Sequence, residues 1–262
     1  MAAAPWIGHL TVGSGWALFL GTPGDNELHA HQALQLCISG GEPLTVTSEA
    51  GPRRREPAVA IATRVAHSVQ AGAGPAAFLY LEPDGAEGRA VAQAIGAGGI
   101  AAASGPAASA LGHELAAIDL DAHEPARAAR LREEIVALWR PASPEPPPAA
   151  CDERVERARR IVRERLGEPR VPAAELARAV GLSASRLAHL FRRETGVPLR
   201  AFVLWARLQR AVEEVAAGRS LTDAALEAGF ADAAHLARTF RRMFGTTVTL
   251  AVGQLRIDVV RT

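Results

Sequence analysis

The fold of this 262-residue chain is decided by the stretch Gly181-Leu-Ser-Ala-Ser-Arg-Leu-Ala-His-Leu-Phe-Arg-Arg-Glu-Thr-Gly196. A related stretch follows it, Ala225-Leu-Glu-Ala-Gly-Phe-Ala-Asp-Ala-Ala-His-Leu-Ala-Arg-Thr-Phe-Arg-Arg-Met-Phe-Gly245. Gly181 corresponds to Gly229 and Gly196 to Gly245, which are 48 and 49 positions later, so the second copy is one residue longer in its turn. This internal repeat indicates one structural unit that is used twice.

Each copy has the residues that a helix-turn-helix unit needs. Ala177 and Ala225 are small enough to let two helices cross closely. Gly181 and Gly229 can adopt the positive φ that ends one helix and turns the chain sharply into the next. The second helix of each copy has an inward stripe, formed by Leu187, Leu190 and Phe191 in the first copy and by Leu236, Thr239 and Phe240 in the second.

The segment that follows residue 150 is predicted to be helical throughout. The predicted helices are Asp152–Leu166, Pro172–Val180, Ser183–Thr195, Pro198–Ala217, one that opens at Ser220, and Asp232–Phe244. The helix Pro198–Ala217 has 20 residues and would span about 30 Å. Because successive major grooves on one face of DNA lie ~34 Å apart, this helix would let both units contact one face of double-stranded DNA.

The outward faces of the second helices are the candidate DNA-binding surface. At about 100° per residue, they comprise Ser185, Arg186, Ala188, His189, Arg192 and Arg193 in the first copy, and Ala234, Ala237, Arg238, Arg241 and Arg242 in the second. Arginine can bind guanine through two hydrogen bonds, and serine or histidine can bond several base edges. The pairs Arg192-Arg193 and Arg241-Arg242 lie further along their helices, nearer to where the phosphates of the DNA backbone would be. The alternative interpretation is that both surfaces are ordinary solvated helix faces that bind no DNA.

Charge is divided unevenly along the chain and favours the DNA interpretation. Residues 1–150 carry 9 basic and 15 acidic residues, a net charge of −6, whereas residues 151–262 carry 20 and 13, a net charge of +7. This division indicates a polyanionic partner for the C-terminal half alone. No apolar run reaches the ~20 residues of a membrane span, and the N-terminus lacks a basic start, so we expect a cytoplasmic protein without a membrane partner.

The N-terminal half is predicted to be a β-rich domain that a linker separates from the helices. Residues 141–150 include five prolines within nine positions, which favours a semi-rigid linker. Before it, the apolar runs Trp6–Leu20, Leu28–Ile38, Pro43–Thr47, Ala58–Val69 and Ala76–Leu81 predict strands of a small sandwich or barrel. Gly85–Ile95 is a possible helix. Pro125–Arg140 is a stronger one, whose apolar stripe would pack on its own domain or pair with a second copy.

Over about residues 155–247 the chain resembles the AraC/XylS family of bacterial regulators, through the two stretches quoted above. The resemblance implies seven helices, recognition helices at 183–195 and 232–244, and a homodimer. It also implies the base-facing positions Ser185, Ala188, His189, Ala233, Ala234, Ala237 and Arg238. Family members usually have proline shortly after the last glycine, but this chain has Val248 there, so the final helix is expected to start differently.

A second resemblance concerns Leu28-His-Ala-His-Gln-Ala-Leu-Gln-Leu36, which is similar to the first motif of cupin barrels. His29 and His31 would point to the same side of a strand, and His67 resembles the third histidine of the family's second motif. Gln35 stands where metal-binding cupins usually have glutamate. Three neutral imidazoles that face one cavity suit one ion of Zn, Fe, Ni or Mn. The same histidines can instead line a pocket for a small molecule, or serve only the structure.

These observations predict an α+β chain of two domains. A cupin-like β-barrel with trailing helices (1–140) would precede a linker (141–150) and an all-α domain with two helix-turn-helix units (151–262). The predicted function is sequence-specific regulation of transcription, with double-stranded DNA as partner and a small molecule or metal ion as effector. An enzyme of the cupin dioxygenase or isomerase type with an added DNA-binding module is the first alternative. A constitutive DNA-binding protein with an inert barrel is the second.

Overall fold

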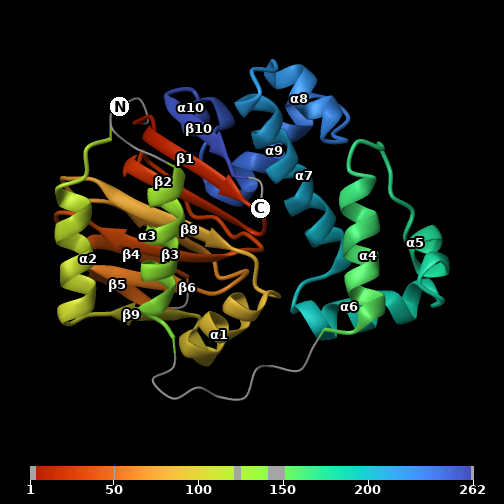
Figure 1. Cartoon of the computed structure of the whole chain (residues 1–262), viewed down its shortest axis with the longest axis horizontal. Helices are drawn as coiled ribbons and strands as arrows, with labels where there is room; N and C mark the ends of the chain where they lie inside the picture. The colour runs from red at the N-terminus through yellow and green to blue at the C-terminus, as the bar shows by residue number, and fades with distance from the viewer. Residues whose placement is uncertain (1–3, 50, 121–124, 141–150, 261–262) are drawn as a thin grey trace. The chain divides into compact units, whose positions relative to one another are not determined.

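The computed structural model describes residues 4–49, 51–120, 125–140 and 151–260 (Figure 1). The chain divides into two compact units. The first comprises the residues up to 145 together with 239–262, and the second comprises 146–238. The predicted linker, 141–150, lies outside the described residues.

The first unit is built on two sheets that are not closed into one ring. Their strands are β1 (Ile7–Gly13), β2 (Trp16–Thr22), β3 (Leu34–Ser39), β4 (Leu44–Ser48), β5 (Gly51–Glu56), β6 (Ala58–Ile61), β7 (His67–Gln70), β8 (Ala76–Leu81), β9 (Ile100–Ala103) and β10 (Leu255–Val259). One sheet has seven strands in the order β10-β1-β2-β8-β3-β6-β9, and the other has three in the order β5-β4-β7. The β-rich N-terminal part is therefore as predicted, with open sheets in place of a closed barrel.

Three helices lie alongside the larger sheet and complete the core of the first unit (Figure 1). They are α1 (Ala86–Ile95), α2 (Pro106–Ala116) and α3 (Pro125–Ala137), with a short 3-10 turn, η1 (Gly96–Gly98), after α1. Leu131 and Ile135 of α3 are buried against the strands, with 1% and 0% of their surface exposed. The apolar stripe of this helix is therefore used within its own domain, and is not left open for pairing with a second copy.

The strands differ from the predicted ones in several places, one of which is the run Ala58–Val69, which covers β6 and most of β7. The run Trp6–Leu20 contains two strands, β1 and β2, because the chain turns at Gly15. In the run Leu28–Ile38 only β3 is a strand, and His29 forms one isolated bridge before it. β5 and β9 were not predicted, since one is rich in arginine and the other in alanine. β10, which follows α10, was not predicted either.

The C-terminal part contains seven helices among its described residues, as predicted. They are α4 (Glu153–Glu164), α5 (Ala173–Ala179), α6 (Ala184–Thr195), α7 (Leu199–Ala216), α8 (Leu221–Glu227), α9 (Ala233–Phe244) and α10 (Val248–Val252). α7 has 18 residues and spans about 27 Å, slightly less than predicted. α10 begins at Val248, where the family usually has proline, and Thr247 caps it, since its hydroxyl accepts a hydrogen bond from Leu250 N at 3.3 Å. No described helix combines the length and apolar character that crossing a membrane requires.

Replacing Ile135 with alanine tests the packing of α3. The substitution removes a fully buried side chain, so we expect the free energy of unfolding to fall by about 2–5 kcal/mol in urea titrations. Glu133→Ala, at an exposed position of the same helix, should change it by less than about 0.5 kcal/mol. Equal effects of the two substitutions would contradict the packing of α3 on the sheet.

Candidate DNA interface and histidine cluster

The two helix-turn-helix units are closed by the same backbone hydrogen bond. Leu182 N donates to Ala177 O at 2.8 Å in the first unit, and Phe230 N donates to Ala225 O at 2.9 Å in the second. Gly181 and Gly229, which directly precede the two donors, have φ values of +70° and +77°. The positive φ reverses the chain directly after α5 and α8, as the residue pattern predicts.

The predicted DNA-facing residues of α6 all lie in solvent. They are Ser185, Arg186, Ala188, His189, Arg192 and Arg193. The hydroxyl of Ser183 caps this helix by accepting a hydrogen bond from Arg186 N at 3.3 Å. The buried side of the helix is the predicted stripe, with Leu187 and Phe191 at 0% exposure. The sequence therefore identified correctly which face of α6 is free.

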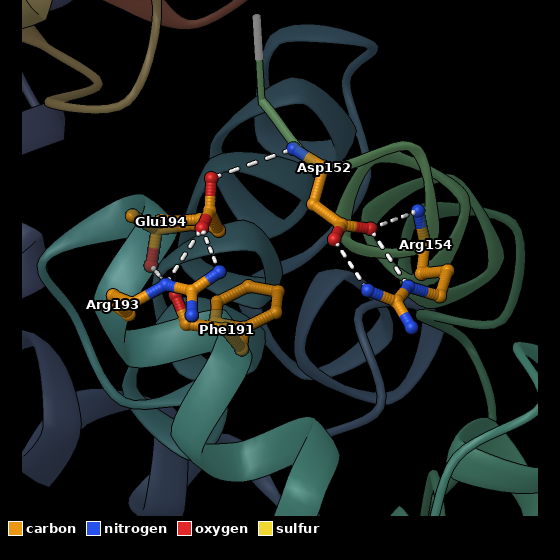
Figure 2. Close-up of polar contacts among 6 residues, drawn as sticks. Asp152, Arg154, Phe191, Arg193 and Glu194 are labelled. Atoms are coloured by element: carbon orange, nitrogen blue, oxygen red, sulfur yellow. Dashed lines mark hydrogen bonds and ion pairs between the residues drawn. The ribbon is translucent and has the colours of Figure 1, made fainter. Parts of the chain in front are cut away.

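One arginine of this face has an acidic neighbour. Figure 2 shows the guanidinium of Arg193 beside the carboxylate of Glu194, with Arg193 Nη2 and Glu194 Oε1 2.7 Å apart. The other oxygen of Glu194 accepts a hydrogen bond from Asp152 N at 3.4 Å, at the start of α4. Arg193 is therefore partly neutralised within its own unit, whereas Arg192 has no carboxylate partner among the described residues.

The corresponding residues of α9 are exposed with two exceptions. Ala234, Arg238, Arg241 and Arg242 are exposed, and Ala233 and Ala237 are half-buried. Arg241 Nη2 lies 2.7 Å from Glu27 Oε1 in an ion pair that sequence reasoning missed. Over the described part of the chain, Arg238 and Arg242 make no ion pair. The second face thus presents Arg238 and Arg242 as its free cations.

Three buried histidines come together in the first unit, as the cupin resemblance implies. Potential ligand nitrogens of His29, His31 and His67 all lie within 4.8 Å of one another. His29 and His67 also form a backbone bridge, in which each N–H donates to the other's carbonyl at 2.9 Å. A tetrahedral ion with Zn–N bonds of about 2.1 Å needs nitrogens about 3.4 Å apart, so the imidazoles would have to draw closer around it.

Backbone carbonyls determine which ring nitrogen carries the hydrogen. The Nδ1 atoms of His29, His31 and His67 lie 2.8, 3.0 and 2.8 Å from the carbonyl oxygens of Glu27, Ala33 and Val65, respectively. A carbonyl can only accept, so each Nδ1 carries the hydrogen. In the neutral rings, Nε2 is then left with a lone pair. Metal-binding histidines are commonly oriented in this way by their second nitrogen.

Gln35 lies between two of these lone pairs. Its side-chain oxygen is 2.9 Å from His31 Nε2 and 2.7 Å from His67 Nε2, and its nitrogen is 3.3 Å from Cys37 Sγ. With neutral rings, these contacts become hydrogen bonds only if the carboxamide turns its NH2 group toward the histidines. A cation bound to the imidazoles favours the opposite orientation, with the oxygen toward it. The donor atoms of the three histidines therefore fit a metal ion, for which the Gln35 oxygen would be a weak fourth ligand.

Burial keeps the cluster uncharged. It lowers the pKa of His31 to about 4 and that of His67 to about 2, with smaller contributions from the neighbouring imidazoles. The pKa of His29 is also lowered by burial. All three rings are therefore neutral at pH 7, the form in which imidazole binds a metal ion. Burial likewise raises the pKa of the Cys37 thiol, which stays protonated and makes a poor ligand.

Two aromatic residues that sequence reasoning did not assign to the site border the cluster. The Tyr80 ring lies 5.4 Å from that of His31, and the Phe244 ring lies 5.5 Å from Tyr80 and 6.2 Å from His31. Phe244 is the last residue of α9 and belongs to the repeated stretch, but its counterpart in the first copy is Thr195. This difference between the two copies is the sequence signal that could have assigned Phe244 to the site.

Comparisons with known proteins agree with this description. A family model described as a helix-turn-helix domain matches residues 176–250. A search of curated proteins gives no match. Among solved structures, an apo form of ToxT from Vibrio cholerae strain SCE256 is 9% identical, with a TM-score of 0.55 over 90% of this chain and 96% of that one.

Two further ToxT structures give the same result. ToxT from Vibrio cholerae in a P21 crystal form is 7% identical, with a TM-score of 0.55 over 92% of this chain and 100% of that one. Wild-type ToxT of strain SCE256 with an unsaturated fatty acid bound is 8% identical, with a TM-score of 0.50 over 96% of each chain. The likeness shows a shared two-part fold. Residues 176–250 of this chain match a helix-turn-helix domain, which is where the two repeated units lie.

Proposed function

We propose that this protein regulates transcription by binding double-stranded DNA through both helix-turn-helix units. The observation that carries the proposal is the repetition: the same turn hydrogen bond closes each unit, and each second helix has an exposed, arginine-bearing face. A single exposed basic face is common on soluble proteins. Two copies in a segment of net charge +7 are better explained by a partner with regularly spaced negative charge.

The exposed residues divide into two roles. His189 and Arg238 lie in the first half of their faces and are assigned to base edges in the major groove. Arg192 and Arg242 lie further along and are assigned to phosphates. Phosphate contacts would supply much of the affinity and a steep salt dependence, whereas the base contacts would supply the sequence preference.

We further propose that the effector is a transition metal ion held by His29, His31 and His67. Support comes from the neutral rings, the Nδ1 hydrogen bonds to carbonyls, and the lone pairs that remain on Nε2. Zn, Fe, Ni and Mn all accept imidazole ligands. Because the ion would draw together two separate segments, the stretch with His29 and His31 and the start of β7, its chemistry here would be structural, as the trigger of a conformational change.

A small organic molecule is the alternative effector. ToxT, which has the same two-part fold, has been solved with an unsaturated fatty acid bound. An organic effector of this chain would use the imidazoles and the Tyr80 ring as a pocket lining. The two effectors are separable by experiment, because only the metal requires imidazole nitrogens as ligands.

Substitution of Arg238 tests the assignment of base reading. We expect Arg238→Ala to lose about 1–3 kcal/mol of discrimination between a duplex enriched from a random library and its single-base variants. Arg242→Ala should weaken binding to all sequences alike and reduce the slope of log K against log salt by about 1. Fluorescence anisotropy titrations at several salt concentrations measure both quantities.

Arg130→Ala serves as the control, because it removes an exposed arginine of α3 in the first unit. It should leave both affinity and specificity unchanged. Uniform weakening by Arg238→Ala across all sequences would contradict its role as a base reader.

Metal content tests the effector. We expect the chain, purified without an affinity metal, to hold about one transition metal ion, measured by elemental analysis. Gln35→Glu adds a carboxylate between His31 and His67 and should tighten zinc binding by about 10–100-fold. His31→Ala should abolish binding, whereas His113→Ala, on the exposed face of α2, should have no effect.

Gln35→Glu keeps this test informative even if His31→Ala unfolds the domain. If neither the wild-type chain nor Gln35→Glu binds zinc in calorimetric titration, the metal proposal is wrong. The cluster would then be assigned to an organic effector, to be sought by binding assays with carboxylic acids.

A further inference from the structure

The chain after α9 ends in a strand, β10, that is part of the N-terminal sheet. β10 pairs in parallel with β1, from Gly8 opposite Leu255 to Val12 opposite Val259 (Figure 1). Val260 N extends the ladder by donating to Val12 O at 2.8 Å. A further backbone bond, from Trp6 N to Leu250 O at 3.0 Å, fixes α10 to the segment before β1. The last strand is therefore an integral edge of the larger sheet.

The C-terminal end of α9 is fixed to the same unit at Glu27. Glu27 N donates a hydrogen bond to Gly245 O at 2.7 Å. Gly245 follows α9 directly, and a Cβ added there would lie 2.2 Å from Glu27 O and 2.8 Å from His29 Nδ1. Only glycine permits this approach. The end of the second recognition helix thus rests on the segment that carries His29.

The side chains of α9 make two more contacts in this unit. Arg241 forms its ion pair with Glu27, and Phe244 packs against the Tyr80 and His31 rings. Both partners of the ion pair are more than half exposed, so the pair itself stabilises little. The pairing of β10 with β1 and the ring contacts of Phe244 therefore contribute most of the stability with which this segment is held on the N-terminal sheet. The ion pair determines that Arg241 faces Glu27.

From these contacts we propose that residues 241–259 form a C-terminal latch, which docks on β1 and Glu27 and keeps the second recognition helix from binding DNA. The inference rests on the proposed DNA-binding function and adds its regulation. In the latched state, Arg241 is occupied by a carboxylate, and that carboxylate brings negative charge to the face that phosphates would approach. Full DNA binding requires Arg241 to leave Glu27.

The position of the latch links it to the histidine cluster. The carbonyl of Glu27 lies 2.8 Å from His29 Nδ1, while the N–H of the same residue binds Gly245. Because Glu27 contacts both His29 and Gly245, a movement of His29 is transmitted through Glu27 to the end of α9. The latch thus gives the cluster a direct route to the DNA-binding face.

A disulfide across the latch tests the proposal in the full chain. Leu10 and Ile257 are directly paired and half-buried, and neighbouring strands lie about 4.8 Å apart, within the Cα range of a disulfide. Leu10→Cys/Ile257→Cys is made together with Cys151→Ser, which removes the half-buried native thiol. We expect the oxidised chain to bind a duplex enriched from a random library about tenfold more weakly than the reduced chain.

The matched control places a disulfide elsewhere in the same unit. Thr45 and Gln70 are paired between β4 and β7, three positions along β7 from His67, so oxidation of Thr45→Cys/Gln70→Cys should change affinity less than twofold. Equal affinities of the oxidised and reduced latch variants would overturn the latch while leaving DNA binding intact. Loss of binding in every form, including the wild-type chain, would overturn both the latch and the proposed function.

A charge substitution provides a second test that needs no disulfide. Glu27→Gln removes the carboxylate that faces Arg241, so DNA affinity should rise about two- to fivefold at low salt. Glu42→Gln removes an equally exposed carboxylate that pairs with Arg55 at 2.9 Å in the same unit, and should leave the affinity unchanged. An equal rise for both variants would reflect net charge alone and would contradict the latch.

Discussion

The exchange of backbone hydrogen bonds between His29 and His67 is the constraint on which the N-terminal site depends. Residues 28–33 belong to no strand, and this bridge is what fixes their start to β7. It brings His31 to the same place and leaves Glu27, two residues earlier, to receive the end of α9. Each imidazole also donates to a nearby carbonyl, so backbone groups help to orient all three rings.

The repeated units show how one turn can be under different constraints in its two copies. A Cβ at Gly181 would meet nothing within 4 Å, so glycine is required there only for the positive φ. A Cβ at Gly229 would lie 2.2 Å from Leu166 O, so this position also excludes side chains through the close approach of the segment just after α4. Alanine should therefore be tolerated less well at Gly229 than at Gly181.

Prediction from the sequence succeeded where a pattern repeats and failed where it does not. The spacing of alanine, glycine and phenylalanine identified both helix-turn-helix units, and two motifs identified the three histidines. β5 was missed because an exposed edge strand of arginines has no apolar alternation. In β10, apolar Leu255, Ile257 and Val259 alternate with charged residues, as in a strand. The family resemblance, however, implied a helix in this part of the chain. The Glu27–Arg241 pair joins residues 214 positions apart, which no local pattern can reveal.

The parallel pairing of β1 with β10 also has a consequence for biosynthesis. β1 leaves the ribosome before β10, which emerges only after the helices α1 to α10 have been made. One side of β1 therefore keeps unpaired N–H and C=O groups throughout translation, a state that invites association with other strands. The order of synthesis delays closure of this edge until β10 has been made, and nascent chains lacking residues 255–259 should be especially in need of a chaperone.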